Sequence, residues 1–396
     1  MNYSFQIREK HEVWDVKKNV TIVTPRGFRD VLPGEADWRE ALKARAMEAI
    51  ALWGYEPVET PTLEVLEVLE LGGQLGKAPF KLFDSDGKLL VLRPDVTIPV
   101  ARMVASRLAT SKGPFRLRYC QPVFREEETH KGQSREFTQI GVEFIGEQGA
   151  ASDAEVILLL IDALKACGLK EFTVAICTVG VLRELLQYLV EKAGASEDWR
   201  RAVLSACHRH NLVEIETLTK NSQIDGHLQS VLLRLLSIRG GKAAIQQCRD
   251  LVEEIGCSDG LDELARTYEI IEALGLSEFV SVDFSVMSAF DYYTGLVLEA
   301  YAPRIGTVLG GGGRYDNMTE AFGRKAPAAG FAFNLDRVMM ALLEQGARSE
   351  DVLSMPACKT VVVDDKTPAD AFIKAAKMRE FGTAVRLVSP DRKERR

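Results

Sequence analysis

The sequence predicts an α+β fold, an antiparallel sheet flanked by helices, with a helical insertion and a short C-terminal α/β unit. Two observations carry this prediction. Residues 115–125 and 135–145 each alternate apolar and polar side chains and are joined by a polar loop, which is the pattern of a strand–loop–strand hairpin. Residues 180–274 show helical periodicity and no strand pattern. Because several strands follow one another without a crossover helix, a doubly wound parallel sheet is disfavoured.

Three helices are predicted before the insertion. Residues 35–52 place Leu, Ala and Ile at helical spacing among good helix formers. A second helix, over 95–108, has Thr97 near its N-cap. A third helix begins at Ser152, because Ser152 and Glu155 have the spacing of a capping box. The strands predicted in the same part of the chain are 89–93, 115–125, 135–145 and 172–177.

The remaining patterns predict how the chain is divided. Strands resume after the insertion at 280–284 and 295–301. Near the C-terminal end, two apolar runs separated by a helical stretch predict a small β–α–β unit. The predicted division is a class II synthetase-like core in two parts (1–179 and 276–344), a helical insertion (180–275) and a short α/β C-terminal segment (345–396).

The composition is that of an ordinary globular protein. The chain has 396 residues, of which 46% are hydrophobic and 27% charged, and this length is enough for two or three domains. A formal net charge of -7 argues mildly against nucleic acid, since phosphate backbones attract basic surfaces. The 7 cysteines lack CxxC spacing and indicate reduced thiols. No apolar run reaches the length of a signal-peptide core or a membrane span, so we expect a soluble cytoplasmic protein.

Four segments carry most of the chemical information. Residues 124–127 (Phe-Arg-Glu-Glu) end the first strand of the hairpin with an arginine. Residues 285–295 contain Asp-Tyr-Tyr-Thr-Gly, residues 309–316 read Leu-Gly-Gly-Gly-Gly-Arg-Tyr-Asp, and residues 330–337 end in Asn-Leu-Asp-Arg. Glycine lets backbone approach a ligand closely, and arginine supplies charge and a planar fork. In this order, the segments resemble the second, the histidine-specific and the third motifs of the histidyl-tRNA synthetases, a class II aminoacyl-tRNA synthetase family.

The resemblance implies a histidine pocket. In that family an acidic residue and a threonine bind the α-amino group, and tyrosines hold the imidazole. The matching positions here are Asp95, Thr97, Arg125, Gln139, Glu143, Tyr293 and Tyr315. Two carboxylates suit an ammonium group and an imidazole N–H. By the same resemblance, a vestigial nucleotide half of the site contains Arg125, Glu127 and Arg337.

Three charged positions of the synthetase motifs are changed in this sequence. Ser288 stands where the family has an arginine that neutralises the histidine carboxylate and the ATP α-phosphate. Glu128 and Gln133 stand where two further arginines are expected. Loss of a single such donor costs about 3–4 kcal/mol of transition-state stabilisation. We therefore predict no catalytic residue, and we assign no metal and no cofactor.

With these changes, the sequence resembles the synthetase-like regulatory subunits of ATP phosphoribosyltransferase. That resemblance implies a non-catalytic subunit of a glycosyltransferase complex in the first step of histidine biosynthesis. The implied partners are a short catalytic subunit, histidine as effector, and a second copy of the chain within a hetero-oligomer, with no tRNA and no membrane. Residues 338–396 are too few for the anticodon-binding domain of roughly a hundred residues that such synthetases carry.

Several alternative interpretations stay open. A histidyl-tRNA synthetase with a degenerate active site, or a synthetase-like ligase acting on a protein, would share these motifs. Tyr292 and Tyr293 could be core aromatics, although a ligand wall is favoured for Tyr293. Gln139 and Glu143 could be a surface pair instead of two groups in one cleft. The Cys-His-Arg-His run at 207–210 suggests zinc, but a helical surface is favoured because no second ligand cluster exists.

Overall fold

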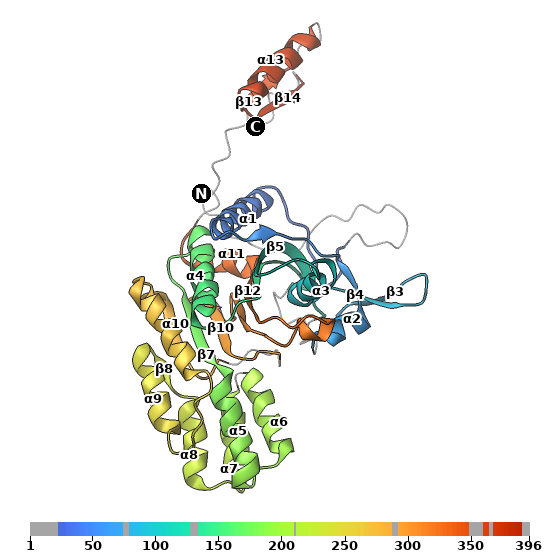
Figure 1. Ribbon diagram of the computed structural model, residues 1–396. Coiled ribbons are helices and arrows are strands. Elements are labelled where there is room, and N and C mark those ends of the chain that lie inside the picture. Colours follow the sequence, from blue (N-terminus) through green and yellow to red (C-terminus); the bar gives the residue numbers. More distant parts are fainter. Residues whose placement is uncertain are drawn as a thin grey trace. The chain divides into compact units, whose positions relative to one another are not determined.

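The structure, a computed structural model, describes residues 23–73, 79–126, 134–209, 211–286, 292–347, 359–363 and 367–389. The chain forms two compact units, Met1–Ala347 and Arg348–Arg396 (Figure 1). The first unit contains the main sheet, the helices that cover it and the helical insertion. Within the described ranges, no helix combines the length and the apolar character needed to cross a lipid bilayer.

The main sheet confirms the predicted fold class. Among the described residues it has nine strands in the order β1-β5-β6-β12-β11-β10-β7-β9-β8. The strands are β1 (Glu56–Pro57), β5 (Phe115–Phe124), β6 (Glu136–Ile145), β7 (Thr173–Thr178), β8 (Arg239–Gly240), β9 (Val280–Asp283), β10 (Leu296–Tyr301), β11 (Gly310–Arg314) and β12 (Ala328–Asn334). Most neighbours are antiparallel, but β1 pairs with β5 and β7 pairs with β9 in parallel. The sequence did not predict the second parallel pair, because its crossover connection is the whole insertion.

The β5–β6 hairpin is the part of the sheet that positions the site. Both strands are 10 residues long, and Tyr119 of β5 lies opposite Gly141 of β6. Every residue of β6 after Glu136 is buried. A strand buried on both faces shows no alternation of exposure, and here helices cover one face while the other contributes to a cavity.

Three helices cover one face of the sheet. They are α1 (Glu35–Ala51), α4 (Ala150–Ala166) and α11 (Leu335–Glu344). α1 packs against β5, α4 against β12 and α11 against β6, and α1 also contacts both other helices. Figure 1 shows the three together beside β5 and β12. Their apolar side chains, such as Leu42, Leu159 and Val338, are fully buried, so this layer supplies most of the core behind the site.

The start of α4 differs from the prediction. Its N-cap is Gly149, with φ of 88°, a conformation that glycine adopts without strain. Ser152 therefore lies inside the first turn, where its hydroxyl donates to the Gly149 carbonyl oxygen at 2.9 Å. Glu155 accepts from Arg116 at 2.7 Å instead of closing a capping box. The spacing of a capping box was present, but both side chains have tertiary partners.

A smaller sheet adjoins the main one. In the described part of the chain it has three strands in the order β2-β4-β3. Its strands are β2 (Leu63–Val65), β3 (Lys81–Phe83) and β4 (Leu89–Leu92). The helix α2 (Leu66–Leu71) follows β2, and α3 (Thr97–Arg107) follows β4. The sequence predicted β4 but missed β2 and β3. The N-cap of α3 is Val96, so Thr97 lies next to the cap as predicted, and the Asp95 carboxylate before it accepts from the Ile98 N–H at 3.2 Å.

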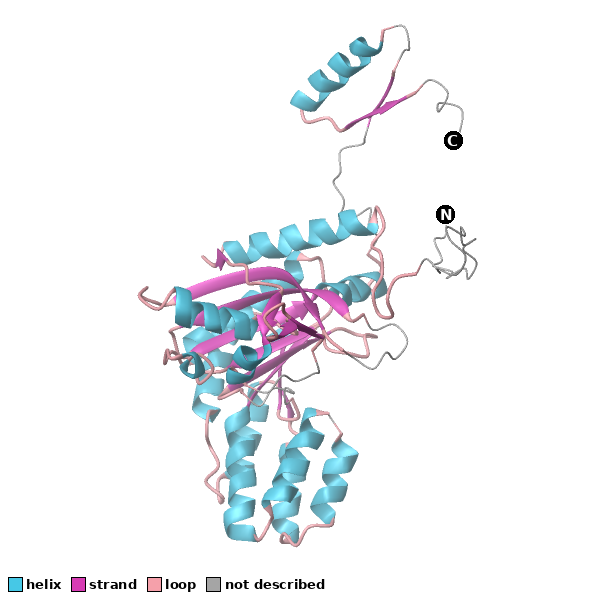
Figure 2. Ribbon diagram, turned by 90° about the vertical axis from the view of Figure 1, so that its right-hand side faces the viewer, coloured by secondary structure: helices cyan, strands magenta, loops and turns pink. Residues whose placement is uncertain are grey.

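The insertion between β7 and β9 is mainly helical. It contains α5 (Val179–Ala193), α6 (Glu197–His208), α7 (Leu212–Lys220), α8 (Gly226–Leu235), α9 (Lys242–Val252), α10 (Leu261–Ala273) and the 3-10 turn η1 (Ser277–Phe279). Figure 2 shows these helices as a group next to the strands of the main sheet. The two-residue strand β8 pairs with β9, so the prediction of a stretch without strands was wrong at 239–240.

The second unit consists of β13 (Lys359–Val362), α13 (Pro368–Glu380) and β14 (Val385–Val388). The two strands pair in parallel, and α13 connects them. Within the described residues of this unit, the buried side chains are Val361, Ala371 and Ala375. Its core is therefore small.

Candidate functional site

A cavity of about 840 Å³ opens beside the main sheet. Its lining comes from β6, β10, β11 and β12, from the segment around Tyr293, and from α6 and α7 of the insertion. The residues predicted from the resemblance to bind histidine all line this one cavity: Asp95, Thr97, Arg125, Gln139, Glu143, Tyr293 and Tyr315. Arg337 lines it too. A volume of this size is typical of small-molecule sites.

Glu143 of β6 is the most deeply buried acid of the cavity, because this residue is only 1% exposed to solvent. Its Oε1 accepts from the Tyr119 hydroxyl at 3.1 Å, and its Oε2 accepts from the Tyr315 hydroxyl. Burial raises the pKa of this carboxyl to about 8, although hydrogen bonds from the neighbouring hydroxyl groups act in the opposite direction. The carboxyl is therefore fixed in position and easily protonated near neutral pH.

Asp95 forms a second acidic position at the start of α3. Its carboxylate accepts from the Ile98 N–H, and the residue is 6% exposed. Burial raises the pKa of Asp95, while the Ile98 N–H and the Arg125 guanidinium lower it. The negative charge of Asp95 adds to the rise in the pKa of Glu143, and the charges of both acids raise the pKa of the Tyr119 hydroxyl. A cationic group placed between them would relieve this repulsion.

Gln139 provides an acceptor that the protein itself does not use. It precedes Glu143 by four positions on β6, so both side chains lie on the same face of the strand. Gln139 is 7% exposed, and its buried Oε1 has no hydrogen-bond partner among the described residues. Leaving a buried acceptor unsatisfied costs about 1–3 kcal/mol. The burial of both residues rules out the interpretation of Gln139 and Glu143 as a surface pair, and the Gln139 oxygen is available to accept a hydrogen bond inside the cavity.

Glycines make room for these polar groups. A Cβ on Gly330 of β12 would lie 2.4 Å from Oε2 of Glu143, and one on Gly141 would lie 2.5 Å from the Tyr119 hydroxyl oxygen. On β11, a Cβ on Gly312 would lie 2.1 Å from the Gly330 carbonyl oxygen. The glycine run 310–313 is thus a strand and not a loop, and it forms a floor of main-chain atoms under the cavity.

Three tyrosines form an aromatic wall. The ring centroids of Tyr292 and Tyr293 are 4.9 Å apart, and those of Tyr292 and Tyr315 are 6.0 Å apart in an edge-on arrangement. All three residues line the cavity. Tyr293 is buried, with 8% of its surface exposed, and it also lines the cavity. It is therefore a core residue and a wall of the cavity at the same time. Such a wall suits a flat aromatic ring, which can stack on or pack edge-on against the tyrosines.

Two arginines that were predicted as part of a vestigial nucleotide half are in contact with backbone. Arg125 Nε donates to the Pro94 carbonyl oxygen at 2.9 Å, and its guanidinium lies 5.0 Å from the Phe137 ring centroid. Arg337 donates to the Val308 carbonyl oxygen at 2.8 Å. The other predicted positions of this half, Glu127, Glu128, Gln133 and Ser288, lie outside the described residues.

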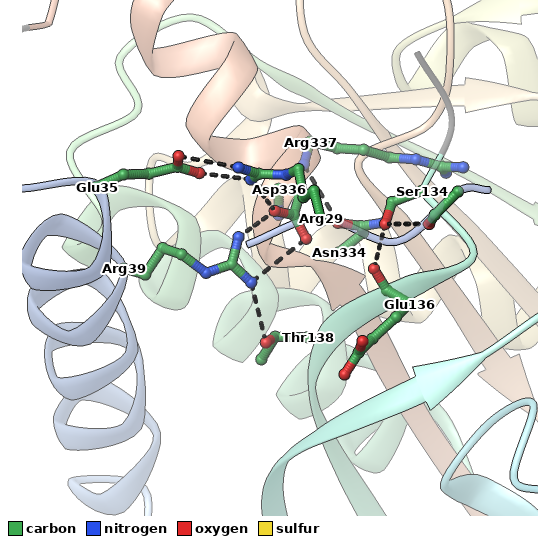
Figure 3. Close-up of polar contacts among 10 residues, drawn as sticks. Arg29, Glu35, Arg39, Ser134, Glu136, Thr138, Asn334, Asp336 and Arg337 are labelled. Atoms are coloured by element: carbon green, nitrogen blue, oxygen red, sulfur yellow. Dashed lines mark hydrogen bonds and ion pairs between the residues drawn. The ribbon is translucent and has the colours of Figure 1, made fainter. Parts of the chain in front are cut away.

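A polar cluster fixes the start of α11, from which Arg337 extends (Figure 3). The Asn334 side-chain oxygen accepts from the backbone N–H groups of Asp336 at 2.8 Å and Arg337 at 3.2 Å, which caps the helix. Arg39 of α1 binds the Asp336 carboxylate and donates to the Thr138 hydroxyl at 3.2 Å. This cluster joins α1, β6 and α11, so it sets the place of Arg337 relative to the cavity.

The run 207–210 contributes to the cavity through its first two residues. Cys207 and His208 line it, whereas His210 lies outside the described residues. Burial raises the pKa of the Cys207 thiol to about 12, so this cysteine stays protonated at neutral pH. In the described ranges no group of three or more His, Cys, Asp or Glu side chains is arranged to hold a metal ion.

Sequence reasoning missed three residues of the site. Tyr119 orients Glu143 from behind, Phe137 lies under the Arg125 guanidinium, and Tyr292 completes the aromatic wall. A signal for Tyr119 existed, because Gly141 lies inside a strand of larger side chains and such a glycine often marks the close approach of another group. For Phe137 and Tyr292 the sequence offered only aromatic character, which is equally typical of a core.

Comparisons with known proteins found a family model and relatives that match most of this chain. The chain matches the family model described as Histidyl-tRNA synthetase over residues 27–338. It is 38% identical over 364 residues to an ATP phosphoribosyltransferase regulatory subunit of Halalkalibacterium halodurans, covering 92% of this chain and 89% of that protein. A protein of the same name from Moorella thermoacetica is 35% identical over 371 residues, covering 93% and 92%.

Solved structures show the same fold. A crystal structure of an ATP phosphoribosyltransferase regulatory subunit/histidyl-tRNA synthetase from Bacillus halodurans C is 35% identical, with a TM-score of 0.83, and the match covers 96% of this chain and 95% of that one. The histidyl-tRNA synthetase of Nostoc sp. PCC 7120 has a TM-score of 0.77 over 96% and 87% of the two chains. At 23% identity, the second likeness shows the fold alone.

Proposed function

This chain belongs to the histidyl-tRNA synthetase-like family of ATP phosphoribosyltransferase regulatory subunits, and from that premise we propose that it regulates this enzyme in the first step of histidine biosynthesis. In this role the chain has no catalysis of its own and is part of a glycosyltransferase complex. It assembles with a short catalytic subunit. Histidine binds in the cavity beside the main sheet and controls the activity of that partner.

The observation that carries the histidine site is the unused oxygen of Gln139. A buried acceptor without a partner among the described residues is costly unless a ligand supplies the donor. Histidine has suitable donors at its α-ammonium group and at its imidazole N–H. The unused oxygen lies on the same strand face as Glu143, in a cavity walled by tyrosines. This combination of acceptors and flat walls supports a ligand that is both polar and aromatic.

The remaining groups suit the parts of a histidine molecule. Asp95 and Thr97 match the positions that bind the α-amino group in the family, and both line the cavity. Glu143 accepts hydrogen bonds from Tyr119 and Tyr315, and an ionised carboxylate has further lone pairs for an imidazole N–H. The Arg125 guanidinium supplies positive charge on the side of the cavity where a ligand carboxylate would lie.

The sequence of the nucleotide half argues against amino-acid activation. Ser288, Glu128 and Gln133 stand where the synthetases carry arginines, so three positive charges are lost and one negative charge is gained. Preorganised cations around a transferring phosphate are usually the largest catalytic contribution. We infer that the chain retains a binding function after losing the groups that would support adenylate formation.

Histidine binding is tested by isothermal titration calorimetry of the full chain. We expect saturable binding of histidine and much weaker binding of histidinol, which lacks the carboxylate that Arg125 would attract. Histidine methylated on an imidazole nitrogen serves as a matched control for the Glu143 contact. If none of these ligands produces heat, the cavity is not the effector site, and this part of the proposal is wrong.

The regulatory role needs a second experiment. We expect the purified chain to co-elute with a short-form catalytic ATP phosphoribosyltransferase during size-exclusion chromatography, and histidine to inhibit the turnover of the complex. The chain alone should form a homodimer by light scattering, as the synthetase core does in the resembling family. Histidine-dependent ATP–pyrophosphate exchange by the isolated chain would overturn the non-catalytic assignment.

A further inference from the structure

The insertion reaches the cavity through a contact that the family motifs do not include. Arg183 lies in the second turn of α5, and its Nη2 donates to the Tyr293 carbonyl oxygen at 2.8 Å. The two residues are 110 positions apart in the chain. A guanidinium is the donor in this bond, and hydrogen bonds from charged donors are stronger than those between neutral groups. The insertion therefore contacts the aromatic wall directly at the main chain of Tyr293.

A second contact from α5 supports the same segment. The Val179 N–H, at the first residue of α5, donates to the Gly295 carbonyl oxygen at 3.0 Å. On the opposite side, the Thr294 N–H donates to the Arg314 carbonyl oxygen of β11 at 2.7 Å. The short segment 293–295 is thus fixed between the start of the insertion and the glycine-rich strand. A shift of α5 would move this segment relative to β11.

The aromatic wall continues from this segment to the buried carboxyl. The rings of Tyr293 and Tyr292 are in contact, the Tyr292 ring meets that of Tyr315, and the Tyr315 hydroxyl donates to Glu143. These contacts form an unbroken path of packed groups from Arg183 to the acceptor proposed for the imidazole. Contiguity alone does not demonstrate coupling, so the path has to be tested by changing its first member.

The neck of the insertion is tightly packed. Gly180 near the start of α5 approaches Asp259, which lies just before α10, so closely that a Cβ would lie 2.4 Å from the Asp259 carboxylate. Gly260, with φ of 77°, leaves no room for a Cβ beside Thr178. The Glu184 carboxylate accepts from the Asp259 N–H at 3.0 Å. The start of α5 is therefore packed tightly against the turn before α10, so α5 is held by another part of the insertion as well as by the sheet.

From these contacts we propose that Arg183 is a positioning residue, which links the occupancy of the cavity to the position of the insertion by holding the main chain of Tyr293. α6 and α7 line the cavity directly through Cys207, Leu212 and Ile215, so the insertion borders the cavity in addition to its contact with Tyr293 through Arg183. The ligand restricts the motion of the aromatic wall, and the hydrogen bond from Arg183 to Tyr293 restricts the motion of α5 in turn. This inference rests on the proposed histidine site, and it names the part of the chain that responds to histidine.

The test compares Arg183→Ala, Arg183→Lys and Arg201→Ala in the full chain. Arg201 on α6 is the matched control, because its side chain is 70% exposed and pairs only on the surface with Asp198. By calorimetry we expect Arg183→Ala to weaken histidine binding on the order of tenfold, Arg183→Lys to restore part of the loss, and Arg201→Ala to match the wild type. The midpoint of thermal unfolding without ligand should stay close to that of the wild type in all three variants.

Hydrogen–deuterium exchange separates positioning from a structural role. In the wild type, histidine should slow exchange both in segment 293–295 and in α5, and in Arg183→Ala it should slow neither to the same extent. Wild-type histidine affinity in Arg183→Ala would overturn the proposal. So would a loss of affinity that is matched by a general loss of thermal stability, because Arg183 would then act on folding.

The two proposals fail in different ways. If the wild-type chain binds no histidine, the proposed effector site is wrong, but the role of Arg183 is still decided by exchange without ligand. Faster exchange of the 293–295 amides in Arg183→Ala than in Arg201→Ala would support the positioning role. Equal exchange in these two variants would overturn it.

Discussion

The amino-acid half and the nucleotide half of the cavity differ in how the protein uses its own polar groups. In the first half, Glu143 is buried and oriented by two tyrosine hydroxyls, and Gln139 keeps an acceptor that no described residue satisfies. In the second half, Arg125 and Arg337 donate to backbone carbonyl oxygens, and Ser288 replaces a family arginine. We propose that the first half is organised to bind a ligand, whereas the second uses its cations partly for structure.

This difference has an energetic meaning. Orienting groups before a ligand arrives reduces the ordering cost of binding, and an unsatisfied acceptor favours the bound state. The amino-acid half has both properties. Catalysis would in addition require cations aimed at a transferring phosphate, and the sequence has removed three of them. We propose that binding and catalysis are separable within this cavity. Each of the following experiments changes either a group proposed for binding or a group needed for catalysis.

The largest effect is expected from Glu143→Gln. The change removes the charge that accepts the imidazole N–H but keeps the shape of the side chain, and we expect histidine affinity to fall by about 100-fold, or roughly 2.7 kcal/mol. Glu136→Gln on the exposed start of the same strand is the control and should bind as the wild type does. Calorimetry measures both variants. An unchanged affinity in Glu143→Gln would place the ligand elsewhere.

A strong pH dependence should accompany this contact. The pKa of Glu143 is raised to about 8 by burial, so the free carboxyl is mostly protonated below that pH. If neutral histidine needs the ionised form, affinity should rise about tenfold for each pH unit from 6 towards 8 and then level off. A flat profile in calorimetry over this range would show that the ligand brings its own proton.

The same group predicts the pH dependence of folding. An acid whose pKa is raised in the folded state stabilises the fold at low pH, and this contribution is lost as pH rises from about 4.5 to about 8. Without ligand, Glu143→Gln should therefore gain stability relative to the wild type across this window, as measured by thermal unfolding. A constant difference between the two proteins would contradict the raised pKa.

Smaller effects are expected from Gln139→Leu, with opposite signs for stability and for histidine affinity. Leucine has a similar volume and removes the unsatisfied acceptor, so the free energy of unfolding without ligand should stay equal or rise by up to about 1 kcal/mol. Histidine affinity should fall about tenfold, because a ligand donor loses its acceptor. Denaturant unfolding and calorimetry on one preparation provide both values. Lower stability together with unchanged affinity would mean that the oxygen of Gln139 serves the fold.

The smallest effect is expected in the nucleotide half. Ser288→Arg restores one of the three missing cations, but Glu128 and Gln133 remain. We expect ATP–pyrophosphate exchange to stay below detection in this variant. Exchange that appears on this single change would show that the second half is less altered than its sequence indicates.

The sequence predicted local elements well where apolar residues recur at the spacing of a helix or form a short apolar run typical of a strand. α1, β4, β5 and β10 lie within a few residues of their predicted bounds. It could not predict the parallel pairing of β7 with β9, because that pairing joins strands separated by the whole insertion. The N-cap at Ser152 was wrong because its hydroxyl donates to the Gly149 carbonyl oxygen and accepts from the Arg314 guanidinium. The contact with Arg314 joins segments that lie far apart in the chain, so it leaves no local trace in the sequence.

The site was predictable as a set of residues but not as an arrangement. The resemblance to the synthetases named Gln139, Glu143 and Tyr315, and the structure brings them to one cavity. It did not reveal that one acceptor is left unused or that Arg183 of the insertion reaches Tyr293. Both features depend on distances between segments that lie far apart in the chain, which single-sequence patterns do not contain.

The glycine strand β11 limits how this protein could be redesigned. Because the floor of the cavity is made of main-chain atoms, substitution at Gly310, Gly312 or Gly330 of the adjoining strand would push a side chain into neighbouring backbone and cannot add a new recognition group. An engineer who wishes the cavity to sense another amino acid must therefore work from the walls, beginning with Gln139 or Tyr315. Such a variant would keep the backbone of β11 and β12 while the ligand selectivity of the cavity changed.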